Sequence, residues 1–307
     1  MGFFGRDIIS IRDFSKDEIL RILDAAQVMQ AGKEKYFGLL SGKVMASLFF
    51  EPSTRTRLSF DAAMQRLGGS VIGFQNPEMT SISKGETTED TIRIIDGYCD
   101  LIVMRHPKDG SVKIAAELAE KPVINAGDGS NEHPTQTFMD LYTIRKEHGA
   151  LENLNVGFVG DLKYGRTVHS LAYALSHFKP NITFISHKSL RMPEKYLKEL
   201  DAKKINYVEE EDLTKASKDL DILYVTRIQK ERFLNPEDYS QVKGGYQIDS
   251  SFLKFTKPSL KILHPLPRVD EINTGLDSAN QSIYFKQAHN GIYVRMALLA
   301  MILKQGN

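Results

Sequence analysis

The sequence has a single cysteine, Cys99, so no disulfide can form within the chain and no cysteine-rich metal site is available. No two histidines have the spacing of metal ligands. The formal net charge is only +1, which provides no general basic field for nucleic acid or an anionic membrane. We therefore expect no nucleic acid and no membrane among its partners, and an anionic ligand would need a local cluster of cations.

Long apolar runs are missing as well. None approaches the roughly 20 residues of a membrane-spanning helix, and residues 1–7 contain neither an apolar core nor a basic leader. These features predict a chain without a signal peptide. Together with the lone cysteine they favour a cytoplasmic location.

The alternation of apolar runs indicates the fold class. A chain of 307 residues is long enough to form two hydrophobic cores. Short apolar runs alternate with longer amphipathic ones, which is typical of α/β architecture with parallel sheets. We therefore predict two similar domains, each a parallel β-sheet flanked by helices. The expected buried strands are 44–50, 101–104, 123–125, 156–159, 182–185, 222–225 and 262–263.

Two helices mark the expected domain boundary. An amphipathic helix begins after His133, at Pro134, and is interrupted near Gly149. A last helix follows residue 285, with its apolar residues on one face. We assign residues 1–133 and 285–307 to one domain and residues 134–284 to the other.

The segment FFEPSTRTRLSF, residues 49–60, places polar residues between a buried strand and a helix. Ser53 is suited to cap this helix, which the apolar spacing extends to Leu67. The first turn of a helix has free backbone N–H groups and the positive end of the dipole. Hydroxyls and an arginine in that turn favour a bound phosphate, and they come from Ser53, Thr54, Arg55 and Thr56. A capped helix with solvated arginines is the alternative that position alone leaves open.

Other polar residues follow expected strands, where the ligand sites of α/β proteins lie. Arg105 follows one strand, Arg227 and Gln229 follow another, and Pro265 with Leu266 follows a third. The prolines in this third segment remove N–H donors and leave carbonyls that can accept from an amine. Solvated arginines and a rigid turn would explain the same residues, and position alone does not decide.

Further segments carry polar residues outside strand ends. A helix N-terminus disfavours a cationic His133, so its neutral imidazole could donate to a carbonyl. We interpret His106 and His264 as structural. On its own, the loop 81–86 would be solvated, and the charged segment 230–248 is long enough to be a mobile lid.

A series of motifs, in order along essentially the whole chain, resembles the aspartate/ornithine carbamoyltransferase family. They are FEPSTRTR at 50–57, KGE at 84–86, MRHP at 104–107, NAGDG at 125–129, HPTQ at 133–136, GDLKYGRT at 160–167, TRIQKER at 226–232 and HPLPR at 264–268. Within the family, the chain is most similar to catalytic chains that use aspartate.

The resemblance implies a reaction and an assembly. The carbamoyl group of carbamoyl phosphate would pass to the amine of L-aspartate, giving N-carbamoyl-L-aspartate and phosphate, a step of pyrimidine biosynthesis. No metal and no organic cofactor would be needed. The resemblance also implies a homotrimer with sites shared between subunits, and it leaves open a separate regulatory chain.

The resemblance also assigns roles to individual residues. The catalytic group would be Arg55, Thr56, Arg105 and His133, with the last three polarising the carbonyl. The substrate-binding group would be Ser53, Thr54, Ser81, Lys84, Gln136, Arg166, Thr167, Arg227, Gln229, Pro265 and Leu266. Ser81, or a residue beside it, and Lys84 would act in the site of a neighbouring subunit. Glu51 would bridge the domains to Arg166 and Arg232.

Three alternatives come from other substrates or classes. Ornithine carbamoyltransferases share the phosphate motif and HPTQ, but usually have His-Cys-Leu-Pro at 264–267. Their second substrate ends in a cation and would need an acidic or neutral pocket. The second half of this chain has cations instead, at Arg166, Arg227, Lys230 and Arg268. A binding subunit without activity is the second alternative. The third, a dehydrogenase, lacks the G-x-G-x-x-G spacing.

Overall fold

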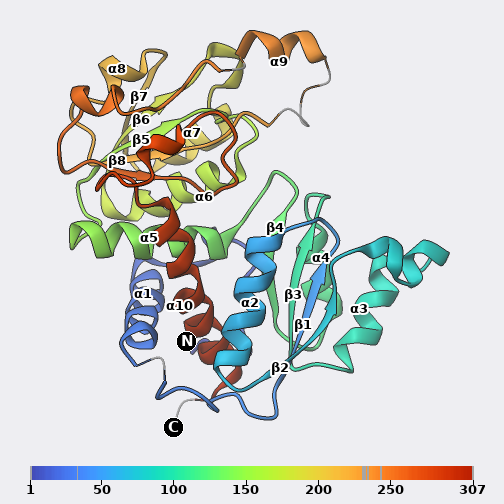
Figure 1. Ribbon diagram of the computed structural model, residues 1–307. Helices are drawn as coiled ribbons and strands as arrows, with labels where there is room; N and C mark the ends of the chain where they lie inside the picture. The colour runs from blue at the N-terminus through green and yellow to red at the C-terminus, as the bar shows by residue number, and fades with distance from the viewer. Residues whose placement is uncertain (1, 33, 230–232, 234, 243, 306–307) are drawn as a thin grey trace. The chain divides into compact units, whose positions relative to one another are not determined.

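The computed structural model of the chain describes residues 2–32, 34–229, 233, 235–242 and 244–305. It divides into two compact units, with unit 1 formed by Met1–Tyr142 and His289–Asn307 and unit 2 by Thr143–Ala288. Each unit contains one parallel sheet (Figure 1), which confirms the predicted fold class. The chain passes between the units within two helices, and the boundaries expected from the sequence lie at the N-terminal ends of the same helices.

Unit 1 is built on a four-stranded parallel sheet with the order β2-β1-β3-β4. Its strands are β1 (Val44–Phe49), β2 (Ser70–Phe74), β3 (Leu101–His106) and β4 (Val123–Asp128). Its helices are α1 (Lys16–Ala31), α2 (Thr54–Arg66), α3 (Thr88–Asp96), α4 (Ser111–Leu118), the first part of α5 (Pro134–His148) and the later part of α10 (Tyr284–Leu303). The chain runs from β1 to β2 on one side and then to β3 on the other, so the carboxyl ends of β1 and β3 form a topological switch point.

Unit 2 repeats this arrangement around a five-stranded parallel sheet with the order β7-β6-β5-β8-β9. The strands are β5 (Asn155–Val159), β6 (Asn181–Ile185), β7 (Asn206–Glu210), β8 (Ile222–Val225) and β9 (Lys261–Leu263). The helices are α6 (Arg166–Leu175), α7 (Glu194–Ala202), α8 (Leu213–Ala216), α9 (Pro236–Val242) and the remaining parts of α5 and α10. Here the switch point lies between the carboxyl ends of β5 and β8.

All seven predicted buried strands are present. Two strands were missed, β2 and β7, and each lies at an edge of its sheet with mostly exposed or half-buried residues. An edge strand is covered less than an inner strand and tolerates polar residues. These two therefore lack the continuous apolar run that identified the others.

A glycine brings the two switch-point loops of unit 2 into close contact. Gly160, directly after β5, has a φ of +115°, and a Cβ there would lie 2.1 Å from the carbonyl oxygen of Thr226, directly after β8. A side chain at this position would have to displace backbone. The sequence GD at 160–161 therefore serves close packing of these loops.

The segment 230–248, predicted to be a lid, contains α9 and reaches Ile248, which pairs with Ile272 in an isolated bridge. Residues 230–232, 234 and 243 lie outside the described part of the chain, so the motion of this segment stays a prediction. Within the described residues, no helix combines the length and the apolar character needed to cross a membrane.

Candidate active site

The first turn of α2 begins where the sequence predicted, with Ser53 at the N-cap position. The predicted capping role of its side chain is wrong, because the hydroxyl accepts no hydrogen bond from the helix. Thr54 and Arg55 are exposed in this turn, and Thr56 is buried. The helix thus begins without a side-chain cap from Ser53, and the N–H groups of its first turn suit an anion.

Arg105 lies near the end of β3, opposite Phe49 of β1 in the register of the sheet. Its Nη2 atom lies 2.9 Å from Oε2 of Glu51, and only 13% of its side chain is exposed. Its Nη1 atom also donates to the carbonyl oxygen of Ala126 in β4, at 3.4 Å. The guanidinium is therefore fixed at the β1/β3 switch point, beside the segment that leads into α2.

His133 and Gln136 are both buried at the start of α5. The carbonyl oxygen of His133 accepts from the backbone N–H groups of Gln136, at 3.0 Å, and of Thr137, at 3.2 Å. The preceding Glu132 is buried and is held by Arg12 and by Ser10. A network of fixed contacts thus holds the segment that carries His133.

Ser81 and Lys84 belong to a short 3-10 helix, η3 (Ser81–Lys84), and both are exposed. Thr80 caps this helix by accepting from the backbone N–H of Ile82. Within the part of the chain that the structure describes, the Lys84 ammonium has no hydrogen-bond or ion-pair partner. The structure thus presents Lys84 to solvent.

In unit 2, a buried carboxylate ties together the two switch-point loops. Asp161 accepts from the backbone N–H of Tyr164, at 2.9 Å, and from that of Gln229, at 3.4 Å. Burial raises the pKa of Asp161 above its ordinary value. Sequence reasoning quoted this residue within a motif but gave it no role. The contacts show that it fixes the loop after β5 relative to the loop after β8.

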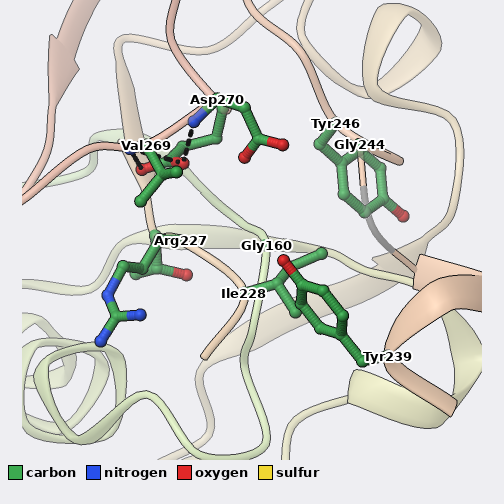
Figure 2. Close-up of a pocket in the computed structure, with 10 residues that line it drawn as sticks. Gly160, Arg227, Ile228, Tyr239, Gly244, Tyr246, Val269 and Asp270 are labelled. Atoms are coloured by element: carbon green, nitrogen blue, oxygen red, sulfur yellow. Dashed lines mark hydrogen bonds between the residues drawn. The ribbon is translucent and has the colours of Figure 1, made fainter. Parts of the chain in front are cut away.

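The predicted aspartate-binding side chains lie in these loops or directly after them. Arg166 and Thr167 are the first residues of α6, and Arg227 and Gln229 follow β8. Arg227 lines a pocket of about 200 Å³. Figure 2 shows Arg227 on one side of it and Tyr239 and Tyr246 on the other. Arg227 therefore adjoins a cavity large enough for a small ligand.

The turn after β9 is organised by His264, which is buried. Its Nδ1 atom accepts from the backbone N–H of Leu266, at 2.7 Å, so its proton lies on Nε2, which is 2.7 Å from Oε1 of Glu271. The carboxylate of Glu271 also accepts from the backbone N–H groups of Val269 and Asp270 (Figure 2). These contacts confirm the structural interpretation of His264 and fix the carbonyls near Pro265.

Arg268 forms a forked ion pair with Asp277, including a 2.7 Å bond from Nη2 to Oδ2. Its charge is therefore already balanced within unit 2. Lys230, like Arg232, lies outside the described residues.

The pair of His264 and Glu271 gives the turn a dependence on pH. Burial favours a raised pKa for Glu271, but the hydrogen bond from His264 and nearby backbone N–H groups bring the pKa below its ordinary 4.5. The ionised carboxylate therefore contributes stability that is fully present above pH 4.5 and is lost as the pH falls through the lowered pKa. We expect Glu271→Gln to lose about 1–3 kcal/mol at neutral pH.

This loss should shrink as the solution is acidified. Urea unfolding followed at about pH 7 and at about pH 4 would measure it. Glu194→Gln is the matched control, because that carboxylate is 78% exposed. A difference between Glu271→Gln and the parent that stays constant with pH would contradict the assignment.

Among the described residues, no group of three or more His, Cys, Asp or Glu side chains could hold a metal ion. The predicted residues fall into one set in unit 1 and one in unit 2. The set of unit 1 contains the N–H groups at the start of α2, hydroxyl side chains and Arg105. These hydrogen-bond donors suit a ligand in which a phosphate is bonded to a carbonyl group. The set of unit 2 presents arginines suited to carboxylates.

The comparisons with known proteins match both units. The family profile described as aspartate/ornithine carbamoyltransferase, carbamoyl-P binding domain, matches residues 6–146. The profile described as the Asp/Orn binding domain of the same family matches residues 152–302. Together the two profiles cover nearly the whole chain.

Similar curated proteins include the aspartate carbamoyltransferase catalytic subunit of Methanopyrus kandleri, 53% identical over 99% of both chains. That of Thermococcus gammatolerans is 52% identical, also over 99% of both. Among solved structures, the catalytic subunit of Methanocaldococcus jannaschii aspartate transcarbamoylase is 51% identical, with a TM-score of 0.89 over 96% of this chain and 97% of that chain.

The aspartate transcarbamoylase of Trypanosoma cruzi, in complex with carbamoyl phosphate and aspartate, is 38% identical, with a TM-score of 0.94 over 98% of each chain. Both halves of the sequence, and the fold of the chain, therefore agree with one family. The chain belongs to the aspartate/ornithine carbamoyltransferase family.

Proposed function

We propose that this chain is an enzyme that transfers the carbamoyl group of carbamoyl phosphate to the amino group of L-aspartate. The products are N-carbamoyl-L-aspartate and phosphate, as in pyrimidine biosynthesis. The observation that carries the proposal is the fixed guanidinium of Arg105 beside the start of α2. Relatives at 52% identity named as aspartate carbamoyltransferase catalytic subunits support the choice of aspartate.

Unit 1 binds carbamoyl phosphate in this proposal. The phosphate dianion is held by the first turn of α2 through Ser53, Thr54, Arg55 and Thr56, and by Arg105. Thr56, Arg105 and His133 donate to the carbonyl oxygen. Such donors matter most when negative charge develops on that oxygen in the transition state. We assign this role to the domain of residues 1–133 and 285–307.

Unit 2 supplies the side chains that hold aspartate, and we assign aspartate binding to the domain of residues 134–284. Arg166, with Thr167, and Arg227, with Gln229, hold the two carboxylates, because the planar fork of an arginine matches a carboxylate bidentately. The carbonyls near Pro265 and Leu266 accept from the carbamoyl NH2 and the attacking amine, and Gln136 also orients the carbamoyl group. With Arg268 already paired to Asp277, Arg166 and Arg227 supply the positive charge.

The chemical step is a substitution at the carbonyl carbon. The neutral amine of aspartate attacks this carbon, a carbon–nitrogen bond forms, and the carbonyl oxygen becomes the oxyanion of a tetrahedral intermediate. The carbon–oxygen bond to phosphate then breaks, and the leaving phosphate takes a proton from the amine. The protein forms no covalent bond to substrate, and positioning of the two substrates supplies much of the rate.

We further propose that the chain assembles as a homotrimer in which Ser81 and Lys84 act in the site of a neighbour. The exposed position of η3, and of the Lys84 ammonium in particular, supports this assignment. The relatives are named catalytic subunits, and we infer that a separate regulatory chain can also bind. The single buried cysteine supports a cytoplasmic location.

The test is turnover of carbamoyl phosphate by the purified chain, with L-aspartate and L-ornithine in parallel. Product with aspartate alone is the expected result. Product with ornithine alone would mean that unit 2 selects a different second substrate. Size-exclusion chromatography of the same sample shows whether a trimer is present. A trimer inactive with both amines would overturn the proposal.

A further inference from the structure

A buried charged pair lies behind one of the substrate-binding residues of unit 1. Nε2 of Gln136 donates to Oδ1 of Asp140 at 2.8 Å, one turn further along α5. Gln136 is only 5% exposed, and Asp140 is fully buried. A carboxylate at such depth has a large cost unless a cation or several donors compensate it.

A cation, Arg295, comes from α10, the last helix of the chain. Arg295 is buried, and its guanidinium carbon lies 4.9 Å from the centre of the Phe60 ring on α2. Burial lowers the pKa of Arg295 to about 10, with the charge of Asp140 acting in the opposite direction. The group is therefore still cationic at neutral pH and interacts with the Asp140 charge.

The fold reserves space for this guanidinium. A Cβ at Gly291, one turn before Arg295, would lie 2.3 Å from its Nη1 atom and 2.5 Å from the sulfur of Met139. Any side chain at this position would displace one or the other. The arginine is therefore seated in a fitted position next to α5.

The carboxylate of Asp140 determines which end of the Gln136 amide faces it. A side-chain amide has a donor end and an acceptor end of nearly the same shape, so either end can point either way. An ionised carboxylate only accepts, and it therefore binds the NH2 end of Gln136 and leaves the oxygen end to accept. Carbamoyl phosphate presents an NH2 group, which needs an acceptor.

We propose that Asp140, compensated by Arg295, is a positioning residue that holds the Gln136 amide with its oxygen available to the carbamoyl NH2. The inference rests on the proposed function, since it assigns Gln136 to carbamoyl phosphate. It adds that recognition of the NH2 group depends on a charged pair that itself makes no contact with substrate. Asn at position 140 would have nearly the same shape but could bind either end of the amide.

The test compares three ligands on the Asp140→Asn variant. Carbamoyl phosphate has the NH2 group, acetyl phosphate has a methyl group in its place, and inorganic phosphate has neither. We expect the Kd of carbamoyl phosphate, measured by calorimetry, to rise about tenfold, the effect of losing one directed hydrogen bond. The Kd values of acetyl phosphate and phosphate should change by less than about twofold.

Further variants separate positioning from damage. Asp7→Asn is the matched control. The Asp7 carboxylate accepts from the backbone N–H of Val123, at the N-terminal end of β4, whereas α5 follows the C-terminal end of this strand. In the Gln136→Ala background, Asp140→Asn should have no further effect on carbamoyl phosphate. Arg295→Lys retains the charge and should change the ligand preference less than Asp140→Asn does.

Each outcome has one meaning. Equal weakening of all three ligands would overturn the inference, because it would show general damage to unit 1. An unchanged preference for carbamoyl over acetyl phosphate in a folded Asp140→Asn variant would also overturn it. A parent protein that does not bind carbamoyl phosphate at all would refute the proposed function instead.

Discussion

Replacing Arg105 with alanine should lower turnover of carbamoyl phosphate and aspartate by about 10²–10³-fold, the usual effect of removing one donor to a developing oxyanion. The side chain is mostly buried, and Glu51 and the carbonyl of Ala126 fix its orientation. The loss should appear in kcat as well as in the KM of carbamoyl phosphate, because the residue serves both the phosphate and the carbonyl.

The matched control is Arg93→Ala, which removes an arginine that is 62% exposed on α3. It should leave turnover nearly unchanged. Since Arg105→Ala leaves Glu51 without one of its partners, thermal unfolding must show that the variant is folded at the assay temperature. Turnover of folded Arg105→Ala within about tenfold of the parent would contradict the assigned role.

The second large effect concerns Lys84. We expect Lys84→Ala to lower turnover by about a hundredfold or more, since it removes a full charge from the proposed binding site of a dianion. The loss should occur without any change in the stability of the subunit, because the exposed ammonium makes no hydrogen bond or ion pair within the described part of the chain. Lys113→Ala, on the exposed side of α4, is the control and should be active.

Mixing the two inactive variants distinguishes a site within one chain from a site shared between chains. If Lys84 acts in the neighbour, a mixed trimer contains sites with an intact Arg105 from one chain and an intact Lys84 from the next. Random reassembly of equal amounts should restore about a quarter of the parent turnover. Mixtures that stay inactive after exchange of subunits would place both residues in the same chain and refute the shared site.

The inner strands and the start of α2 could be predicted because burial leaves a plain signal in the sequence. Continuous apolar runs marked β1, β3, β5 and β8, and the polar residues directly after them marked both switch points. The edge strands β2 and β7 left no such signal, because exposure permits Ser70, Asn206 and Glu209 within them.

The contacts that orient the site could not be predicted in the same way. The whole of unit 2 separates Asp140 from Arg295 in the sequence, and nothing local to either residue indicates the other. Asp161 and Gln229 lie 68 residues apart in sequence but meet at the β5/β8 switch point. Such pairs follow from the topology, so they appear only once the order of the strands is known.

The division of the chain has a consequence for its synthesis on the ribosome. Unit 2 is continuous, but unit 1 needs the later part of α10, which contributes Val294, Met296, Leu298, Leu299 and Ile302 to its buried core. A domain folds once all its segments have emerged. The core formed by the first 142 residues therefore stays incomplete until the whole of unit 2 has been translated. The nascent chain therefore completes its second unit before its first, and Asp140 gains the charge of Arg295 only near the end of translation.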